Sequence, residues 1–302
     1  MPATTGEPAL DLSVVPTDRY PLIRILNHSE AVLCAYAFDT ENDTPVFIKV
    51  KDAEVASNGL RVAREADILA SLAHPQIPRL IDADVAGDQP FPYVVSELKP
   101  GGAYPKKLLD EKFIPRLAAK ICLSALEPLG YAHGQGFIHR DVKPDNLLMR
   151  TDGRQTSLVD FELGMRVDPS PSLDMVKALL GNEQQDLSRI TQVGEVVGTA
   201  DYISPERALG RRGDQRSDIY SMGVVLYRLL YASEPFRGKA GEVAELHVSR
   251  PIDFYNKTRD IPEALIGVME VATQKEPNYR YASAGEMGEA LERYLTDTSA
   301  RI

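Results

Sequence analysis

Apolar and polar residues follow a strand-like pattern over the first hundred residues of the chain and a helical pattern over most of the remainder. The runs AVLCAYAF (31–38), PVFIKV (45–50) and FPYVVSEL (91–98) have the composition of strands. Between the second and third runs, apolar residues recur at helical spacing over residues 59–73, and a His-Pro pair follows them. This pattern predicts a small sheet accompanied by one helix.

The Pro- and Gly-rich stretch KPGGAYP (99–105) marks the change of pattern and has the composition of a connector. Beyond it, helical periodicity recurs over four long segments: 114–136, 218–232, 261–274 and 283–297. We therefore expect an α+β protein with two lobes, a β-rich one over 19–98 and a mainly helical one over 99–302. Residues 1–18 are predicted to form a flexible N-terminal tail.

Composition restricts the classes of partner. The formal net charge of −10 argues against a nucleic-acid surface, because phosphate backbones are bound by basic patches. Only two cysteines, Cys34 and Cys122, occur in 302 residues, as expected for the reducing cytoplasm. The most apolar long window, 219–232, is too short to span a bilayer and contains Arg228. We expect a cytoplasmic protein with no membrane segment and no nucleic-acid partner.

The segment FIHRDVKPDNLLM (137–149) concentrates charged and amide groups between apolar ends. Asp141, Lys143 and Asn146 fall in a predicted loop, and Asp160 follows a short strand-like run. These residue types suit phosphoryl transfer. A carboxylate accepts the proton of an attacking hydroxyl, a Lys offsets the charge of the moving group, and an amide oxygen with a second carboxylate holds Mg²⁺.

HRDVKPDN (139–146) and the Asp160-Phe161 pair resemble the catalytic loop and metal-binding motif of the eukaryotic-type protein kinases. Lys143, two residues after Asp141, is similar to the Ser/Thr branch that is common in bacteria. The resemblance covers most of the chain and implies the bilobal kinase fold. It also implies ATP as cofactor, with Mg²⁺ and with Mn²⁺ as an alternative ion.

The same resemblance assigns roles to individual residues. It implies six catalytic or metal-binding groups: Lys49, Glu65, Asp141, Lys143, Asn146 and Asp160. Lys49 would pair with the ATP phosphates and with Glu65, while Asn146 and Asp160 would hold the metal. Ser96 would be the gatekeeper beside the adenine, with Glu97 and Lys99 supplying backbone contacts to it.

The nucleotide loop departs from the family pattern. Asn27, Ser29 and Val32 occupy the positions of its three glycines, and Glu30 adds a negative charge. Asn27 could keep the turn through a positive φ, which β-branched Val32 tolerates poorly. Two interpretations have equal weight: a stiffer lid that binds ATP more weakly, and an ordinary hairpin that contacts ATP through its side chains.

A second departure is Glu162, which replaces the glycine that usually follows Asp160-Phe161. Its carboxylate could add a ligand to a metal ion or point to solvent, and we favour the solvent-facing interpretation. If Glu162 restrains the metal-binding segment, a Glu162→Gly substitution is expected to raise turnover.

The activation segment is predicted over 160–206. In the family, an Arg at the position of Arg140 pairs with a phosphate on this segment, which makes Ser188 and Thr191 candidate phosphosites. The resemblance also places Thr199 beside Asp141 and Lys143.

The favoured function is a Ser/Thr protein kinase that transfers the γ-phosphate of ATP to protein hydroxyls and phosphorylates itself, an activity with which a dimer is compatible. The alternative is a pseudokinase, a nucleotide-binding or scaffold module whose altered loop and DFE motif impair catalysis. A small-molecule phosphotransferase is a weaker third interpretation, since such relatives usually lack a residue of the Lys143 type.

Overall fold

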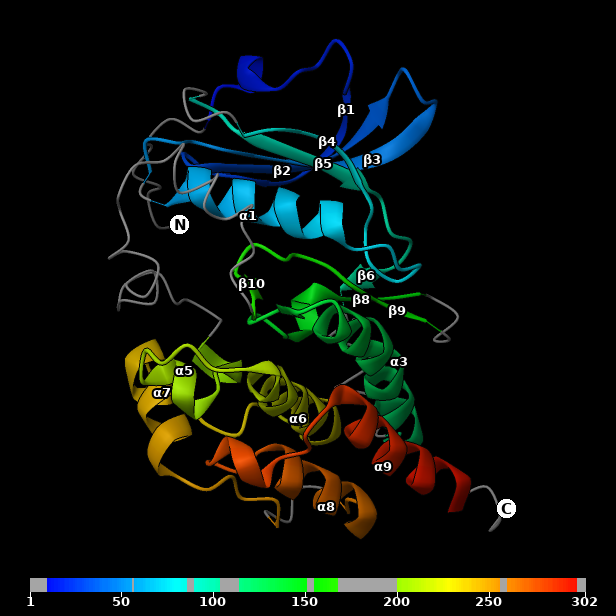
Figure 1. Ribbon diagram of the computed structural model, residues 1–302, viewed down its shortest axis with the longest axis vertical. Coiled ribbons are helices and arrows are strands. Elements are labelled where there is room, and N and C mark those ends of the chain that lie inside the picture. The colour runs from blue at the N-terminus through cyan, green and yellow to red at the C-terminus, as the bar shows by residue number, and fades with distance from the viewer. Residues whose placement is uncertain are drawn as a thin grey trace, which may run out of the picture. The chain divides into compact units, whose positions relative to one another are not determined.

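The chain forms two compact units in the computed structural model (Figure 1). The first unit ends at Lys99 and also includes Phe161–Leu163, and the second contains the remaining residues from Pro100 onward. The structure describes residues 10–55, 57–85, 90–103, 114–150, 155–167, 200–255 and 260–297.

The first unit is built on a five-stranded antiparallel sheet with the strand order β1-β2-β3-β5-β4. The strands are β1 (Leu22–His28), β2 (Val32–Asp39), β3 (Thr44–Lys51), β4 (Leu80–Asp84) and β5 (Tyr93–Glu97). The three runs that alternation predicted correspond to β2, β3 and β5. Because β2 alternates between buried and half-exposed positions, its two sides face different surroundings.

One helix, α1 (Asn58–Ser71), accompanies the sheet (Figure 1). Its buried residues include Val62, Ala66 and Leu69, which recur at the spacing of one helix face. The helix ends at Leu72, whose backbone is extended. The predicted helix over 59–73 is therefore confirmed to within two residues at its C-terminal end.

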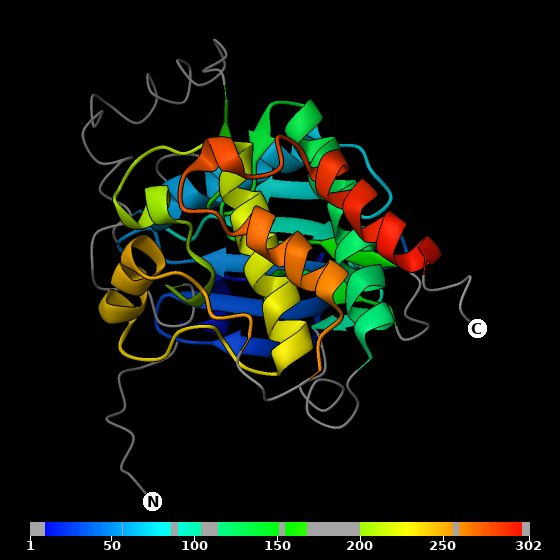
Figure 2. The ribbon, with the colours of Figure 1, turned by 90° about the horizontal axis from the view of Figure 1, so that it is seen from below.

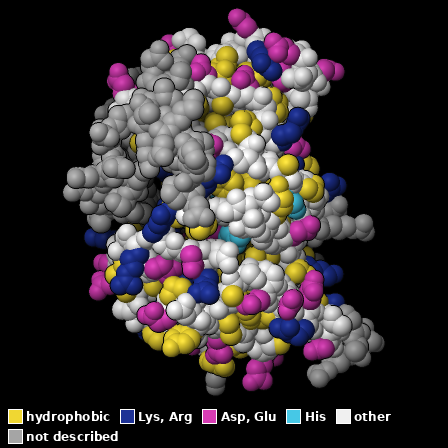
Figure 3. All heavy atoms as spheres, viewed as in Figure 1, with side chains coloured by type: hydrophobic (Ala, Val, Ile, Leu, Met, Phe, Trp, Pro, Cys, Tyr) yellow, Lys and Arg dark blue, Asp and Glu magenta, His cyan; other side chains and the backbone are white. Residues whose placement is uncertain are grey.

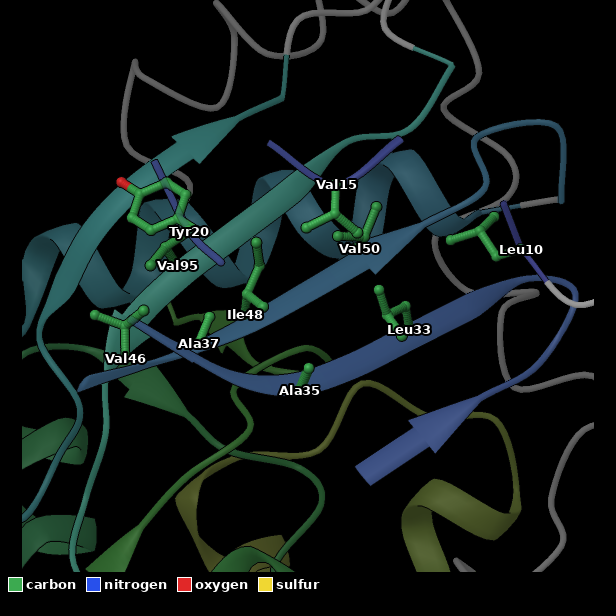
Figure 4. Close-up of a cluster of buried hydrophobic side chains, with 10 residues drawn as sticks. All are labelled: Leu10, Val15, Tyr20, Leu33, Ala35, Ala37, Val46, Ile48, Val50 and Val95. Atoms are coloured by element: carbon green, nitrogen blue, oxygen red, sulfur yellow. The ribbon is translucent and has the colours of Figure 1, made fainter. Parts of the chain in front are cut away.

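The two faces of the sheet carry different side chains. On β3, Val46, Ile48 and Val50 are fully buried and point to the face opposite that of Lys49, because successive side chains alternate. Lys49 contacts α1, so the apolar residues lie on the face away from that helix. Figure 4 shows this core cluster, which comprises Leu10, Val15, Tyr20, Leu33, Ala35, Ala37, Val46, Ile48, Val50 and Val95.

The N-terminal segment covers this apolar face. Leu10, Val15 and Tyr20 are buried in the cluster, and a short 3₁₀ helix, η1 (Leu12–Val14), connects the first two. The predicted flexible tail over 1–18 is thus wrong for residues 10–18. These residues pack on the sheet because its apolar face would otherwise be exposed to water.

The second unit is mainly helical. Figure 2 shows α9 running alongside α3 and α8 alongside α6, and both pairs are in contact. Its described helices are α3 (Pro115–Gly134), α5 (Pro205–Ala208), α6 (Gln215–Tyr231), α7 (Ala240–Ser249), α8 (Glu263–Ala272) and α9 (Ala284–Asp297). The four long helical segments that periodicity predicted correspond to α3, α6, α8 and α9.

Short strands and 3₁₀ turns frame the motif-bearing loop of the second unit. One sheet pairs β7 (Phe137–Ile138) with β10 (Met165–Arg166), and the other has the order β6-β8-β9. The elements of that second sheet are β6 (Gly102–Ala103), β8 (Leu147–Met149) and β9 (Thr156–Leu158). The 3₁₀ turns are η2 (Pro144–Asn146), η3 (Ala200–Tyr202) and η4 (Pro277–Tyr279). Residues 139–146 therefore lie between β7 and β8.

Charged side chains of both signs are interspersed on the face of the molecule shown in Figure 3. None of the described helices combines the length and the apolar character needed to cross a lipid bilayer.

Candidate active site

In the first unit, the side chains of Lys49 and Glu65 form a buried ion pair. Lys49 extends from β3 and Glu65 from α1, with Nζ 2.8 Å from Oε2. The two side chains are only 8% and 7% exposed, and each charge compensates the other in this buried position. The contact that the family resemblance implies between these residues is present.

Glu162 does not point to solvent, and the interpretation that we favoured from the sequence is wrong. Its side chain is 15% exposed, and Oε1 lies 2.6 Å from Nζ of Lys51 and 3.4 Å from Nη1 of Arg61. Its Oε2 lies 3.5 Å from Nζ of Lys49. The physical reason is electrostatic: three cations of β3 and α1 surround this position.

Residues 29–32 close an ordinary hairpin between β1 and β2. The N–H of Ser29 donates to the carbonyl of Val32 at 2.9 Å, and its hydroxyl does so at 3.3 Å. Asn27 lies within β1 opposite Cys34 and has no positive φ, so the expectation that Asn27 forms the turn is wrong. The N–H of Leu10 also donates to the carbonyl of Ser29 at 3.0 Å.

The predicted adenine-contacting residues lie at the end of β5. Ser96 is buried, whereas Glu97 is half-exposed at the last position of the strand. Nζ of Lys99 donates to the carbonyl of Pro75 at 2.8 Å and pairs with Glu97 at 2.9 Å. These contacts order the segment where the first unit ends, while its role toward adenine stays a prediction.

In the second unit, Asp141, Lys143 and Asn146 are brought together by the loop that η2 closes. Oδ2 of Asp141 accepts hydrogen bonds from Nζ of Lys143 at 2.6 Å and from Nδ2 of Asn146 at 3.0 Å. Oδ1 of Asp141 is buried and accepts no hydrogen bond from the described residues. The carboxylate is therefore fixed through one oxygen, and the other is left as a buried acceptor.

Asn146 presents a complementary arrangement. Its Nδ2 also donates to the backbone carbonyl of Asp141 at 2.8 Å, so both of its hydrogen bonds use the nitrogen. The amide oxygen accepts no hydrogen bond from the described residues. Together with the carboxylate of Asp160, it would give a donor set of hard oxygens, which fits Mg²⁺.

The environment shifts the pKa of both members of the Asp141–Lys143 pair. Burial raises the pKa of the Asp141 carboxyl, against the opposing effect of Lys143, and Asp160 adds to the increase. Burial acts to lower the pKa of Lys143, but the charge and hydrogen bond of Asp141 outweigh it and raise that pKa. A carboxylate with a raised pKa is a stronger base, which suits proton acceptance.

The buried carboxylate of Asp218, on α6, binds the backbone of the loop that contains Asp141. Oδ2 of Asp218 accepts from the N–H of His139 at 2.8 Å, and Oδ1 accepts from the N–H of Arg140 at 2.7 Å. His133 contacts the same carboxylate at 2.8 Å. Burial acts to raise the pKa of Asp218, but His133 and His139 outweigh it and lower that pKa. The two backbone hydrogen bonds fix the loop that carries Asp141.

Two residues of the second unit have unusual backbone conformations. Arg140 has a φ of 68° and Asp160 a φ of 67°, both in the left-handed region that non-glycine residues rarely adopt. Such conformations persist where surrounding contacts impose them, and they concentrate at functional sites.

A second buried ion pair stabilises the helical unit. Arg280 contacts both carboxylate oxygens of Glu206, at 2.8 and 2.7 Å. Ser217 donates to the same carboxylate at 2.6 Å. Because both side chains are buried and paired, the role of this ion pair is structural.

The candidate regulatory residues divide between described and undescribed parts of the chain. Arg140 is described, and its Nη2 donates to the carbonyl of Arg212 at 2.7 Å. Ser188, Thr191 and Thr199 lie outside the described residues.

Sequence reasoning missed three residues that contact the predicted groups: Lys51, Arg61 and His133. For Lys51, a signal was present, because a residue two positions from Lys49 on a strand has its side chain on the same face. For His133, no local pattern indicated the contact with Asp218, which is 85 residues away in the sequence.

The fold, the Asp141 loop and the Lys49–Glu65 pair are those expected of a protein kinase domain. Comparison with known proteins agrees, since the sequence model of the protein kinase domain matches residues 31–292. The chain belongs to the protein kinase family, in the eukaryotic-type Ser/Thr branch found in bacteria.

The chain is similar to several curated bacterial kinases. It is 34% identical over 279 residues to the serine/threonine-protein kinase PknB of Mycolicibacterium smegmatis, covering 90% of this chain and 42% of the relative. It is 32% identical over 289 residues to a probable serine/threonine-protein kinase of Streptomyces coelicolor, covering 92% and 40%. The chain therefore spans about two fifths of the length of these relatives. Proteins of this family use ATP with a divalent metal ion.

Proposed function

We propose that this chain is an active Ser/Thr protein kinase that transfers the γ-phosphate of ATP to hydroxyl groups of proteins, its own included. The observation that carries the proposal is the hydrogen bonding of the Asp141 carboxylate. Its Oδ2 is fixed by Lys143 and Asn146, and its Oδ1 is a buried acceptor without a partner among the described residues. This arrangement suits the orientation and deprotonation of a hydroxyl.

In the proposed reaction, the substrate hydroxyl oxygen attacks the γ-phosphorus and the bond from that phosphorus to ADP breaks. The hydroxyl proton passes to Asp141. Lys143 offsets negative charge on the transferred group, and Lys49, held by Glu65, does the same at the other phosphates.

The amide oxygen of Asn146 and the carboxylate of Asp160 are the proposed metal ligands. Oxygen donors favour Mg²⁺, with Mn²⁺ as an alternative ion. When bound, the ion offsets the negative charge of the triphosphate. For adenine, we propose backbone contacts from Glu97 and Lys99 beside Ser96.

The β1–β2 hairpin is proposed to cover the phosphates without glycines. Asn27, Ser29 and Val32 would contact ATP through side chains and backbone of an ordinary hairpin. The hydrogen bonds from Ser29 to Val32 and from Leu10 to Ser29 support a stiff loop.

Regulation is proposed to act through Arg140, which would bind a phosphate on Ser188 or Thr191. Thr199 would contact Asp141 and Lys143 from the end of the same segment. Autophosphorylation between two copies of the chain is compatible with this scheme. Dependence on ATP and the low cysteine content support action in the cytoplasm.

The pseudokinase alternative receives no support from a specific contact. All six groups that phosphoryl transfer uses are retained in the sequence: Lys49, Glu65, Asp141, Lys143, Asn146 and Asp160. Loss of a catalytic or metal-binding carboxylate would remove a main electrostatic contribution, whereas loss of loop glycines would not.

Transfer of labelled γ-phosphate from ATP to the chain itself and to a generic basic protein tests the proposal. We expect transfer by the wild type and a loss of at least ~10²-fold in the Asp141→Asn variant, because that change removes the base. Asp145→Asn is the matched control, since Asp145 lies in the same loop but is exposed. Equal labelling by wild type and Asp141→Asn would indicate a contaminating kinase and contradict the proposal.

A further inference from the structure

Glu162 joins a compact cluster of charges in the first unit. Its carboxylate contacts Lys51 at 2.6 Å, Arg61 at 3.4 Å and Lys49 at 3.5 Å. Lys49 also lies 2.8 Å from Glu65. These ion pairs join three cations to two carboxylates, and one of the two carboxylates stands where the kinase pattern has a glycine.

Strand and helix geometry explain why the cations gather there. Lys49 and Lys51 are two residues apart on β3, so their side chains leave the same face. Arg61 and Glu65 are four residues apart on α1 and lie on the same side of that helix. The carboxylate of Glu162 reaches the cations of both elements.

The buried positive charge of Lys51 is compensated by the carboxylate of Glu162. The Lys51 side chain is 5% exposed, and Glu162 is its only ion-pair partner among the described residues. Burying an ammonium group without a partner is costly, so a glycine at position 162 would leave this charge uncompensated. The buried ammonium group at position 51 therefore requires the carboxylate at position 162.

Glu162 also determines which carboxylate each cation binds. Its Oε1 attracts Lys51 and Arg61, and Lys49 is closer to Glu65 than to Glu162. Without Glu162, Lys51 and Arg61 would lose the carboxylate that binds them. Because Coulomb attraction acts on both cations, they would then compete with Lys49 for the carboxylate of Glu65.

We propose that Glu162 is a positioning residue for phosphoryl transfer: it binds Lys51 and Arg61, which keeps Lys49 paired with Glu65 and anchors Phe161–Leu163 to β3 and α1. Phe161 is fully buried and Glu162 has no positive φ, so this segment does not need a glycine here. The inference rests on the proposed kinase activity. It predicts that Glu162→Gly and Glu162→Gln lower turnover, the opposite of the result expected if Glu162 merely restrains the segment.

The kinetic experiment compares the wild-type chain with Glu162→Gln, Lys51→Gln and the double variant. We expect each single change to lower kcat by about tenfold, with KM for ATP changed by less than about threefold. The double variant should be no slower than the slower single variant, because both changes remove one shared contact. Unchanged or increased kcat in Glu162→Gln, or multiplying losses in the double variant, overturns the proposal.

Glu54→Gln is the matched control, since Glu54 is an exposed carboxylate of the same unit. It should keep the wild-type kcat. Glu162→Asp retains the charge and should recover part of the activity lost in Glu162→Gln. If Glu162→Gln does not fold, Glu162→Asp carries the comparison, with kcat expected between those of wild type and Lys51→Gln; a kcat at or below that of Lys51→Gln contradicts the role of the charge.

Amide hydrogen exchange gives a readout that needs no catalysis. Exchange should become faster in α1 and in Phe161–Leu163 for Glu162→Gln and Lys51→Gln, and should stay unchanged for Glu54→Gln. If the wild type transfers no phosphate, the proposed kinase function fails while the exchange result still decides the positioning contact. Identical exchange in Glu162→Gln and wild type overturns the positioning role whatever the activity.

Discussion

At the scale of single residues, burial and a neighbouring cation act in opposite directions on Asp141. Burial raises its pKa, and Lys143 lowers it through its charge and through the 2.6 Å hydrogen bond. The burial effect prevails, so the pKa lies above the ordinary value of 3.8. Lys143 therefore limits how far the pKa of Asp141 rises, in addition to its proposed role of offsetting charge on the phosphoryl group.

We predict that Lys143→Gln moves the acid limb of the pH–rate profile to higher pH. Removal of the cation removes a contribution that lowers the pKa of Asp141, so that pKa rises further and the base form is reached only at higher pH. The loss of an adjacent opposite charge always acts on a carboxyl pKa in this direction. The measurement is kcat/KM between pH 5 and 8 for wild type and variant.

Both proteins should be assayed with the same substrates, so that titration of ATP and of the acceptor affects both profiles equally. The exposed Asp145→Asn variant, two residues further along the loop, serves as a control for nonspecific effects of a charge change. A midpoint for Lys143→Gln at or below that of the wild type contradicts the assigned environment of Asp141.

The residue scale also shows what the sequence could predict. The Lys49–Glu65 pair and the contact of Lys143 with Asp141 followed from motifs, because their spacing is tied to one fold. The contact of Glu162 with Arg61 joins residues 101 positions apart and has no motif. For such a residue, the sequence indicates only that a carboxylate is present, and the surrounding cations decide where it points.

At the scale of elements, the N-terminal segment is part of the first unit's core. Leu10 is 6% exposed and packs in the cluster with Leu33 and Val50, and its N–H and carbonyl bond to Ser29 and His28. Leu12, two residues further along, is 40% exposed. The segment thus offers two leucines in contrasting environments.

We predict that Leu10→Ala lowers the free energy of unfolding by about 2–3 kcal/mol, whereas Leu12→Ala changes it by less than about 1 kcal/mol. The first change leaves a cavity against the sheet, and the second removes a mostly hydrated side chain. Urea unfolding followed by far-UV circular dichroism measures both. Equal effects of the two substitutions would indicate that residues 10–18 do not pack on the sheet.

Periodicity predicted the elements of which one side is buried. It failed for a strand that is mostly exposed and for a segment that is buried without regular structure. Alternation identified β2, β3 and β5, but β1 is almost entirely exposed and gave no such pattern. The segment 10–18 has no regular period and was taken as a tail. Its burial depends on the apolar face of a sheet that forms from other residues.

At the scale of the whole molecule, the residues of the proposed reaction belong to two units, and sequence motifs identify each group separately. Lys49 and Glu65 belong to the first unit, and Asp141, Lys143 and Asn146 belong to the second. Family motifs could predict this division because each is tied to its own element of the fold. The polar networks inside the helical unit have no comparable signature.

The network around His247 is one of them. His247 is fully buried, with Nδ1 2.8 Å from the hydroxyl of Tyr220 and Nε2 3.0 Å from the carbonyl of Asp201. Nζ of Lys275 donates to the carbonyl of His247 at 2.7 Å. Burial, and then the charge of Lys275, lower the pKa of His247 from 6.5 to about 4.

This shift predicts that the protein loses stability as the pH falls from about 6.5 to about 4. In that range the unfolded state binds a proton at His247 and the folded state does not, so acid favours unfolding. Between pH 7.5 and 4.5, His247 alone should contribute a loss of roughly 2 to 3 kcal/mol, given the two pKa values.

The measurement is the free energy of unfolding by urea for wild type and His247→Gln at several pH values. His247→Gln should be less stable than wild type at pH 7.5, where it lacks the network, but should lose roughly 2 to 3 kcal/mol less on acidification. Parallel curves for the two proteins would mean that His247 titrates alike in the folded and unfolded states, and would contradict its burial as a neutral residue.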